Sequence, residues 1–339
     1  MNTADVIIIG GGIIGCALFY ELAKNSVNKI ILLERDEVAS GTSGESGGFI
    51  RKLNLDPYLS QLSAESFDYY LNFTKEVGES CDFMQTGLTY TIPNHMLALI
   101  QSNIGNLMDE NYPIEVRAST DASLIYEYNA GYINTTLTCK NWVKAALKNK
   151  AIVYEHCPAL NLLYSGGKVN GVETPQGVIE AQTIIVATGF YSAAFSPLLD
   201  LNSLISIKSF QYHLYLKASQ YIDHAYINHF EGWYLFPQKT GHLLAGYINR
   251  DKESLTEKHN KHLDESEASS LHKLLCKHFP WIINKPYTIK RSYDAYTADE
   301  QGLMHKSSIK GLFYATGLSG GGIKIAPAFA KRVIELLDS

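Results

Sequence analysis

The chain has 339 residues, of which 46% are hydrophobic, and it carries a formal net charge of −5. This length and apolar content suit one large domain or two interlocked ones, and they exclude a disordered chain. The acidic balance and the lack of any Lys/Arg-rich block speak against nucleic acid and anionic membrane surfaces as partners.

The spacing of the cysteines and the hydropathy of the chain indicate in which cellular compartment the protein works. Five cysteines are widely spaced and form no C-x-x-C pair: Cys16, Cys81, Cys139, Cys157 and Cys276. This pattern fits a reducing cytosol, so we expect a cytoplasmic protein. The apolar N-terminus lacks the basic n-region of a signal peptide. No apolar run reaches the roughly 18 residues of a membrane span, so none is expected.

A glycine motif between a strand and a helix opens the chain. Residues 6–9 predict a buried parallel strand and residues 13–24 a helix, with G-x-G-x-x-G between them; the second strand, "KIILLERD", ends on an acidic residue. In such a unit the glycines admit a pyrophosphate and the acidic residue accepts from a ribose hydroxyl, which predicts an NAD or FAD site. The predicted cofactor-binding residues here are Gly10, Gly12, Ile13, Ile14, Gly15, Glu34 and Arg35.

A second polar loop follows at residues 36–52, "DEVASGTSGESGGFIRK". An NAD-binding domain would continue with an ordinary helix and strand, whereas hydroxyl and amide groups at this density can line a long phosphate-bearing ligand. The alternative is a flexible linker, which the ending "GGFIRKLN" disfavours. The cofactor-binding residues predicted here are Thr42, Ser43, Ser46, Gly47 and Gly48.

Alternating aromatic strands mark two stretches, residues 86–134 and 203–298. Examples are residues 209–216, "SFQYHLYL", and residues 232–248, in which "QKTGH" predicts a hairpin turn. A polar helical insert is expected at residues 254–279. We interpret its histidines as a solvated helix face and predict no metal site, because their spacing matches no known ligand pattern. These histidines are His259, His262, His272 and His278.

Residues 181–189 and 309–317 echo each other as hydrophobic strands that end in Ala-Thr-Gly. Such ends fit a sheet edge where the backbone passes close to a cofactor. The second echo leads into "GLSGGGIK" and a helical pattern, which indicates either an anion site at a helix N-terminus or a plain strand-to-helix turn. The cofactor-binding residues predicted in these segments are Ala187, Thr188, Gly189, Gly317, Ser319, Gly320, Gly321, Gly322, Ile323 and Lys324.

Four of these segments together resemble the FAD-dependent D-amino-acid-oxidase-like (DAO) family, which includes sarcosine oxidase, glycine oxidase and D-amino-acid dehydrogenase. The segments are the N-terminal motif, "SGTSGESGGFIR", "TIIVATGFYS" and "GLFYATGLSGGGIKIAP". The resemblance implies an α/β fold: a Rossmann-like FAD-binding domain with an inserted antiparallel β-sheet substrate domain. We expect the FAD-binding domain at residues 1–85, 135–202 and 299–339, and the substrate domain at residues 86–134 and 203–298.

The resemblance also implies a reaction, the oxidation of the C–N bond of a small amino acid or N-alkyl amino acid. Hydride passes to flavin N5, and water hydrolyses the resulting imine. Arg51 and Lys324 stand where sarcosine-oxidase-like members clamp the substrate carboxylate, and Lys52 is a weaker substitute for Arg51. Aromatic walls are expected from four tyrosines, of which Tyr296 is the best candidate for an active-site residue. The other three are Tyr212, Tyr234 and Tyr247.

Two departures from the family pattern lead to further expectations. Asp294 stands where some relatives carry the cysteine that binds flavin covalently, so we predict non-covalent FAD. Leu244 stands where sarcosine oxidases carry a lysine that promotes reaction with oxygen. A dehydrogenase, which passes its electrons to another acceptor, therefore remains an alternative to an oxidase. Oxidation of a 2-hydroxy acid and a non-catalytic FAD-binding subunit remain alternatives. The sequence leaves the electron acceptor, the oligomeric state and the substrate side chain open.

Overall fold

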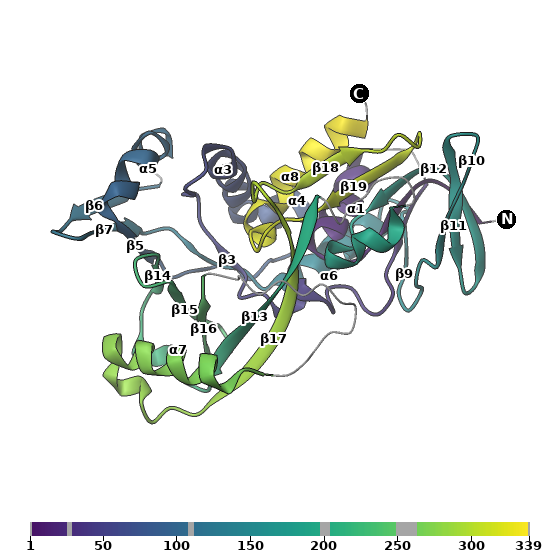
Figure 1. The fold of residues 1–339 in the computed structure, drawn as a ribbon. Helices are drawn as coiled ribbons and strands as arrows, with labels where there is room; N and C mark the ends of the chain where they lie inside the picture. The colour runs from purple at the N-terminus through teal and green to yellow at the C-terminus, as the bar shows by residue number, and fades with distance from the viewer. Residues whose placement is uncertain (1, 26–28, 108–111, 197–203, 249–262, 338–339) are drawn as a thin grey trace.

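A computed structural model describes residues 2–25, 29–107, 112–196, 204–248 and 263–337 (Figure 1). In this part of the chain the strands form two eight-stranded sheets and one three-stranded sheet. The helices that pack around them are α1 (Ile13–Asn25), α2 (Thr42–Glu45), α3 (Pro57–Leu71), α4 (Phe73–Val77), α5 (Asn94–Leu107), α6 (Thr135–Leu147), α7 (Glu265–His278) and α8 (Gly322–Leu337). None of these helices combines the length and apolarity needed to cross a membrane.

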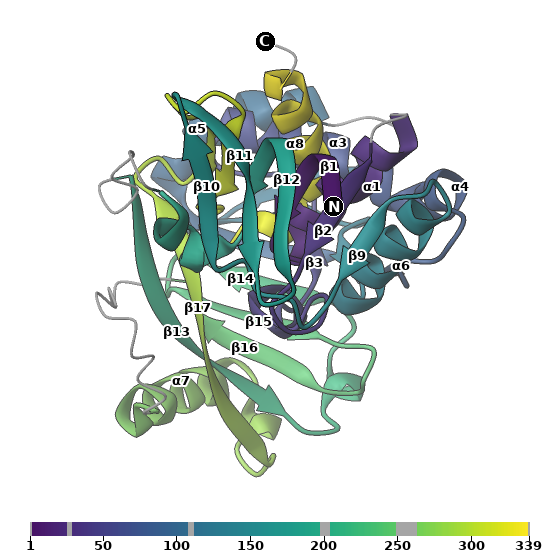
Figure 2. The same ribbon diagram turned by 90° about the vertical axis from the view of Figure 1, so that its right-hand side faces the viewer.

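The first sheet contains β1 (Asn2–Ile9), β2 (Ile30–Leu33), β9 (Ile152–Tyr154), β10 (Asn161–Ser165), β11 (Lys168–Thr174), β12 (Gly177–Val186), β18 (Leu303–Lys306) and β19 (Leu312–Thr316). Its order is β10-β11-β12-β1-β2-β9 (Figure 2). In addition, β19 pairs with β12, and β18 pairs with β19. The pairs β12–β1, β1–β2, β2–β9 and β12–β19 are parallel. The predicted strand at residues 6–9 and helix at residues 13–24 lie in β1 and α1.

Alternation along β1 divides its side chains between two cores. Val6 and Ile8 pack with α1, α6 and α8, whereas Ile7 and Ile9 pack on the opposite face of the sheet. Both faces are covered, which accounts for the continuous apolar run that the sequence shows here.

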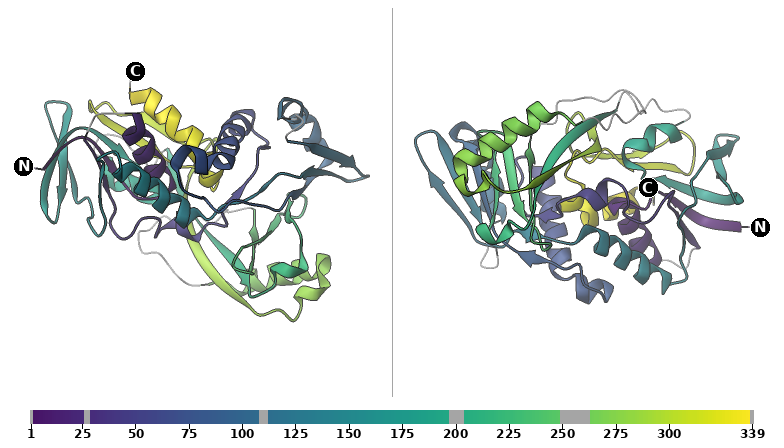
Figure 3. Two further views of the ribbon diagram at one scale, coloured as in Figure 1. Left: turned by 180° about the vertical axis from the view of Figure 1, so that it is seen from behind. Right: turned by 90° about the horizontal axis from the view of Figure 1, so that it is seen from below.

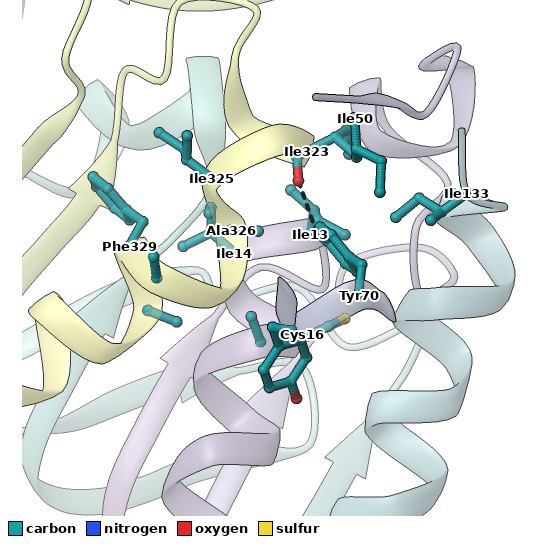
Figure 4. Close-up of a cluster of buried hydrophobic side chains, with 14 of the residues drawn as sticks. Ile13, Ile14, Cys16, Ile50, Tyr70, Ile133, Ile323, Ile325, Ala326 and Phe329 are labelled. Carbon is teal, nitrogen blue, oxygen red and sulfur yellow. Dashed lines mark hydrogen bonds between the residues drawn. The ribbon is translucent and has the colours of Figure 1, made fainter. Parts of the chain in front are cut away.

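The start of α8 is anchored by buried side chains of α1 and α3 (Figure 4). The Tyr70 hydroxyl of α3 donates a hydrogen bond of 2.8 Å to the Ile323 carbonyl, and Ile13 of α1 belongs to the same buried cluster as Ile325. This packing fixes the glycine-rich residues 317–321, which connect β19 to α8.

The second sheet contains β5 (Leu88–Pro93), β6 (Ile114–Ala118), β7 (Ala122–Glu127), β13 (Ile205–Tyr215), β14 (Ala225–Asn228), β15 (Trp233–Pro237), β16 (Leu243–Tyr247) and β17 (Tyr287–Thr297). Its order is β17-β13-β16-β15-β14-β5-β7-β6. The parallel pair β14–β5 joins strands from the two predicted insertions, and the other pairs are antiparallel. Figure 3 shows these strands gathered at the end of the molecule away from β1. The domain boundaries themselves stay a prediction.

The two faces of this second sheet differ in what covers them. Trp233, Leu235, Leu243 and Ala245 pack with α7 in one apolar cluster, and the intervening residues point the other way. The predicted "QKTGH" turn joins β15 to β16, where the Gln238 N–H donates to the His242 carbonyl at 2.9 Å.

The interpretation of the histidines as a solvated helix face is wrong for His272. This side chain is half-buried, and its Nδ1 lies 3.0 Å from the Tyr215 hydroxyl of β13, because α7 turns its apolar stripe of Leu271 and Leu275 onto the sheet. His278 contacts Glu231 instead, at 2.5 Å. His259 and His262, with residues 254–262 of the expected helix, lie outside the described residues. In the part of the chain that the structure describes, no cluster of metal-ligating side chains is present.

The small third sheet links the polar loop to the first insertion. It pairs β3 (Phe49–Ile50) and β4 (Met84–Gln85) with β8 (Gly131–Tyr132). Gly48, which precedes β3, has φ +67°, and a Cβ there would stand 2.1 Å from the Ile133 carbonyl oxygen. A glycine is therefore required for this approach, which places the residues after β3 beside the second sheet.

Candidate active site

A cavity of about 1020 Å³ lies at the carboxyl ends of β1, β2, β12 and β19. In parallel α/β sheets this edge is where nucleotides bind. Most of the predicted cofactor residues line it: Gly10, Gly12, Ile13, Ile14, Glu34, Arg35, Thr42, Ser43, Ser46, Ala187, Thr188, Gly189, Gly317, Gly320, Gly322 and Ile323. Gly47, Gly48, Ser319, Gly321 and Lys324 line a second cavity, and Gly15 lines neither of the two.

The three motif glycines have different tasks. Gly10 has φ +106°, and a Cβ there would stand 2.6 Å from the Ala187 carbonyl oxygen. A Cβ at Gly15 would meet the Gly10 carbonyl oxygen at 1.8 Å, so Gly15 allows α1 to pack on the turn. Gly12 is different, because apart from its chain neighbours the described residues bring just one atom within 4 Å of its missing Cβ, the Ser43 hydroxyl oxygen at 3.3 Å. Its missing side chain therefore leaves room in the cavity.

Glu34 is held at the end of β2 by backbone donors. Its Oε2 accepts from the Gly11 N–H at 2.6 Å, and its Oε1 accepts from the Asp36 N–H at 2.8 Å. Gly11 was missed by the motif analysis, which assigned it no task, although a Cβ there would stand 3.0 Å from this carboxylate. The three consecutive glycines were the available signal.

The polar loop contributes hydroxyl groups to the same cavity. Ser43 Oγ accepts a hydrogen bond of 2.9 Å from the Ile13 N–H at the first turn of α1, and Thr42 Oγ1 donates to the Tyr293 carbonyl at 2.8 Å. Because Ser43 uses its oxygen as an acceptor here, its O–H remains a donor for a phosphate oxygen. A large cavity, an open glycine cradle at Gly12 and an oriented carboxylate at Glu34 together fit a bound dinucleotide.

The second cavity, of about 490 Å³, adjoins the first. Thr42, Ser46, Asp294, Leu318 and Gly320 line both. Its walls are the residues after α2, the start of α8 and the face of the second sheet opposite α7. That face is aromatic: Tyr90, Phe210, Tyr212, Tyr234, Phe236 and Tyr296 all line the cavity. Arg51, Lys324 and Tyr296 are thus brought together.

Arg51 is 5% exposed and lines this second cavity. Its guanidinium carbon stands 4.3 Å from the centre of the Tyr90 ring, and its Nη1 lies 3.6 Å from Oε1 of Glu127. Among the described residues, Nε and Nη1 have no hydrogen-bond acceptor. Buried donors without acceptors are unfavourable, so this guanidinium is poised to bind a carboxylate.

Glu127 and His229 were missed by sequence reasoning. Glu127 is fully buried, and its Oε2 accepts from the Leu53 N–H at 3.0 Å and from the Tyr112 hydroxyl at 2.7 Å. His229 lines the cavity, and its pKa is lowered to about 4 by burial and then by the charges of Arg51 and Lys324. Its imidazole is therefore neutral at pH 7.

Two further residues lie outside the cavity lining. Tyr247 packs against the apolar cluster under α7, so the expectation that it forms an aromatic wall is wrong; the alternation of β16 turns Leu244 toward the cavity instead. Lys52 is the second residue that lies outside the lining. Its Nζ pairs with Asp68 Oδ1 at 2.8 Å, away from the cavity that Arg51 lines.

We predict that FAD is released intact when the holoprotein is denatured. All five cysteines lie in the described part of the chain, and none lines either cavity, while Asp294 lines both. No thiol is therefore placed to form a thioether with a bound flavin. Acid precipitation followed by absorbance measurement should find the flavin in the supernatant, and yellow colour that stays with the washed precipitate would contradict the prediction.

Comparison with known proteins agrees with this geometry. The model of the family described as "FAD dependent oxidoreductase" (DAO) matches residues 5–336. Human mitochondrial dimethylglycine dehydrogenase is 24% identical over 270 residues, which cover 74% of this chain and 31% of that protein. Glycine oxidase of Bacillus subtilis (strain 168) is 25% identical over 272 residues, which cover 71% of this chain and 69% of that protein. The chain thus spans about a third of the length of the first relative.

Solved structures share the fold. L-proline dehydrogenase from P. horikoshii superposes with a TM-score of 0.87 at 19% identity, covering 99% of this chain and 93% of that one. Glycine oxidase from Bacillus cereus ATCC 14579 superposes with a TM-score of 0.81 at 17% identity, covering 99% and 95%. The arrangement of the two cavities therefore sits on a fold that FAD enzymes use.

Proposed function

Because the chain belongs to the DAO family of FAD-dependent oxidoreductases, we propose that it oxidises the C–N bond of a small amino acid or N-alkyl amino acid. The observation that carries the proposal is Arg51, a buried guanidinium with two donors that lack acceptors, in a cavity that adjoins the dinucleotide cavity. Lys324, in the first turn of α8, lines the same cavity. Two cations that line one aromatic cavity suit the carboxylate of an amino acid.

The cofactor and the protein have separate tasks in this proposal. Bound FAD supplies the two-electron oxidant that accepts a hydride from the substrate carbon next to nitrogen. Gly10, Gly12, Glu34 and Ser43 would hold the dinucleotide, and N–H groups at the start of α8, where Gly320 and Gly322 line the same cavity, would stabilise negative charge on the bound cofactor. The nitrogen lone pair of the neutral amine then forms the C=N bond. Water adds to this imine, and cleavage of the C–N bond releases an amine or ammonia.

The remaining work of the protein is binding and orientation. Arg51 and Lys324 would fix the carboxylate, and the aromatic face would exclude water from the reacting carbon. Neutral His229 can accept a hydrogen bond from the substrate amine, which a protonated imidazole could not do. The names of the matched glycine oxidase and dimethylglycine dehydrogenase support a substrate of this class.

Anaerobic mixing of FAD-loaded protein with defined compounds tests the proposed function. The panel contains glycine, N-methylglycine, N,N-dimethylglycine, D- and L-amino acids and matched 2-hydroxy acids. We expect at least one amino acid to bleach the oxidised-flavin absorbance and to yield an amine or ammonia. Readmitting air then separates an oxidase, which recovers its colour at once, from a dehydrogenase, which Leu244 favours. Bleaching by 2-hydroxy acids alone, or by no compound in a fully loaded protein, would overturn the proposal.

A further inference from the structure

A third cation lines the second cavity. Lys208 lies on β13, where the alternation of the strand turns Lys208, Phe210 and Tyr212 toward the cavity and Ser209 and Gln211 away from it. The side chain is half-buried. Because the sequence shows only a strand rich in aromatic residues here, the lysine is apparent as part of the site only once the register is known.

The contacts of Lys208 leave its charge without a carboxylate. Its Nζ stands 4.7 Å from the centre of the Tyr296 ring, and among the described residues it forms no ion pair. Asp294 is its direct partner in the β13–β17 register, and Oδ1 of Asp294 accepts from the Ala295 N–H at 2.9 Å. An aromatic face stabilises an ammonium group only partly, so a position remains for an anion.

Lys208 and Arg51 stand far apart along the second sheet. Arg51 lies over Tyr90 of β5, and β14, β15 and β16 separate that strand from β13. At about 4.8 Å per strand, four steps correspond to roughly 19 Å between the backbones of β13 and β5. Lys208 reaches the cavity from β13, and Arg51, which follows β3, reaches it over Tyr90 of β5. A cavity of about 490 Å³ is also much larger than a molecule of glycine requires.

Five acidic residues line the same cavity, and among the described residues none of them forms an ion pair with Lys208. Asp56 caps α3 by accepting from the Leu59 N–H at 2.8 Å, and Asp299 accepts from the Gln301 N–H at 3.1 Å. Glu45 and Glu300 are exposed. Lys208 on β13 and Arg51 over Tyr90 of β5 thus line the cavity at strands four steps apart, while Asp56 and Asp299 hold backbone groups and Glu45 and Glu300 face solvent.

We propose that Lys208 binds a second anionic group of the substrate, which makes the substrate class an amino or N-alkyl amino dicarboxylic acid with several carbons between its carboxylates. This inference rests on the proposed function, because the first carboxylate is the one that Arg51 and Lys324 hold. Lys208 acts in specificity and takes no part in bond breaking. A monocarboxylic amino acid of the same length would leave the ammonium group of Lys208 without an anionic partner.

Matched ligands and variants test the proposal. The ligands are glutamate, N-methylglutamate and 2-aminoadipate, each beside its distal amide, mixed anaerobically with the FAD-loaded protein. We expect the wild-type protein to prefer each dicarboxylate in apparent Kd for flavin reduction by about tenfold, the scale of one charge-assisted hydrogen bond. Lys208→Met should abolish this preference, and Lys208→Arg should retain it. Lys285→Met is the control, because Lys285 stands 3.8 Å from the Tyr221 ring outside both cavities.

A second readout works without turnover. Glutarate and its monoamide are titrated against the oxidised holoprotein, and their binding is followed by the shift of the flavin spectrum. If no amino acid reduces the flavin, the proposed function fails, yet a glutarate preference that Lys208→Met removes would still support the anion site. Equal binding of the acid and the amide by the wild-type protein would overturn the Lys208 proposal. If Lys208→Met weakened the binding of glutarate and of its monoamide equally, the proposal would also be overturned, because the lysine would then only hold Tyr296 in position.

Discussion

Changing Arg51 to Met together with Glu127 to Gln is expected to raise the apparent Kd for the substrate while FAD remains bound. Two charge-assisted hydrogen bonds to the carboxylate are lost, which corresponds to about 2.8 kcal/mol or roughly 100-fold in Kd. Both residues are changed because Glu127 is fully buried. Removal of Arg51 alone would leave the buried carboxylate of Glu127 without a cation, at a cost of about 3–5 kcal/mol in folding free energy. Anaerobic flavin reduction as a function of substrate concentration measures the change.

Two controls separate the clamp from general damage to the protein. Glu127→Gln alone keeps Arg51, and its amide oxygen can still accept from Leu53 and Tyr112, so we expect no more than a few-fold change. Lys52→Met removes a neighbouring cation that pairs with Asp68 outside the cavity, and it should leave the apparent Kd unaltered. If Lys52→Met weakened substrate binding and the Arg51 variant did not, the carboxylate would have been assigned to the wrong cation.

Local patterns were sufficient to predict the cofactor side of the fold. The strand at residues 6–9, the helix at residues 13–24 and the glycine spacing between them depend on neighbours within a few positions, and the structure confirms these elements. The α/β fold class is confirmed as well. The tasks of Gly10 and Gly15 follow from the same turn. Gly15 approaches the Gly10 carbonyl of the turn itself, and Gly10 approaches the Ala187 carbonyl at the end of the neighbouring strand β12.

The substrate side was less predictable because its residues meet through strand pairing. Arg51 was identified by resemblance, but its surroundings combine Glu127 of β7, Tyr90 of β5 and His229 after β14. The parallel β5–β14 pair brings these together, and no short-range signal encodes such a pairing. A shift of one residue reverses which side chains face the cavity. This explains why Tyr247 was placed wrongly and Lys208 was missed.

Gly12→Val is expected to abolish FAD binding while the protein stays folded. Gly12 does not have a positive φ, and the nearest atom to an added Cβ is Ser43 Oγ at 3.3 Å, so the fold can accept a side chain there. The two methyl groups would occupy the space that the backbone leaves for a pyrophosphate. Because Gly12 lies at the N-cap of α1, the loss of stability should be only about 1 kcal/mol. The ratio of flavin to protein absorbance and the Tm of the apoprotein measure the two effects.

Gly105 and Gly10 provide control variants for the Gly12→Val prediction. Gly105 lies in α5, and apart from its own helix no atom of the described residues stands within 4 Å of an added Cβ. Gly105→Ala should therefore keep FAD and stabilise the helix by about 0.5–1 kcal/mol. Gly10→Ala should lower the Tm of the apoprotein as well as FAD binding, because φ is +106° and the Ala187 oxygen stands 2.6 Å from the new methyl group. A Gly12→Val protein that retained a full complement of FAD would show that the dinucleotide does not approach α1 at this glycine. An apoprotein as unstable as the Gly10 variant would instead mean that Gly12 serves the fold, as Gly10 and Gly15 do.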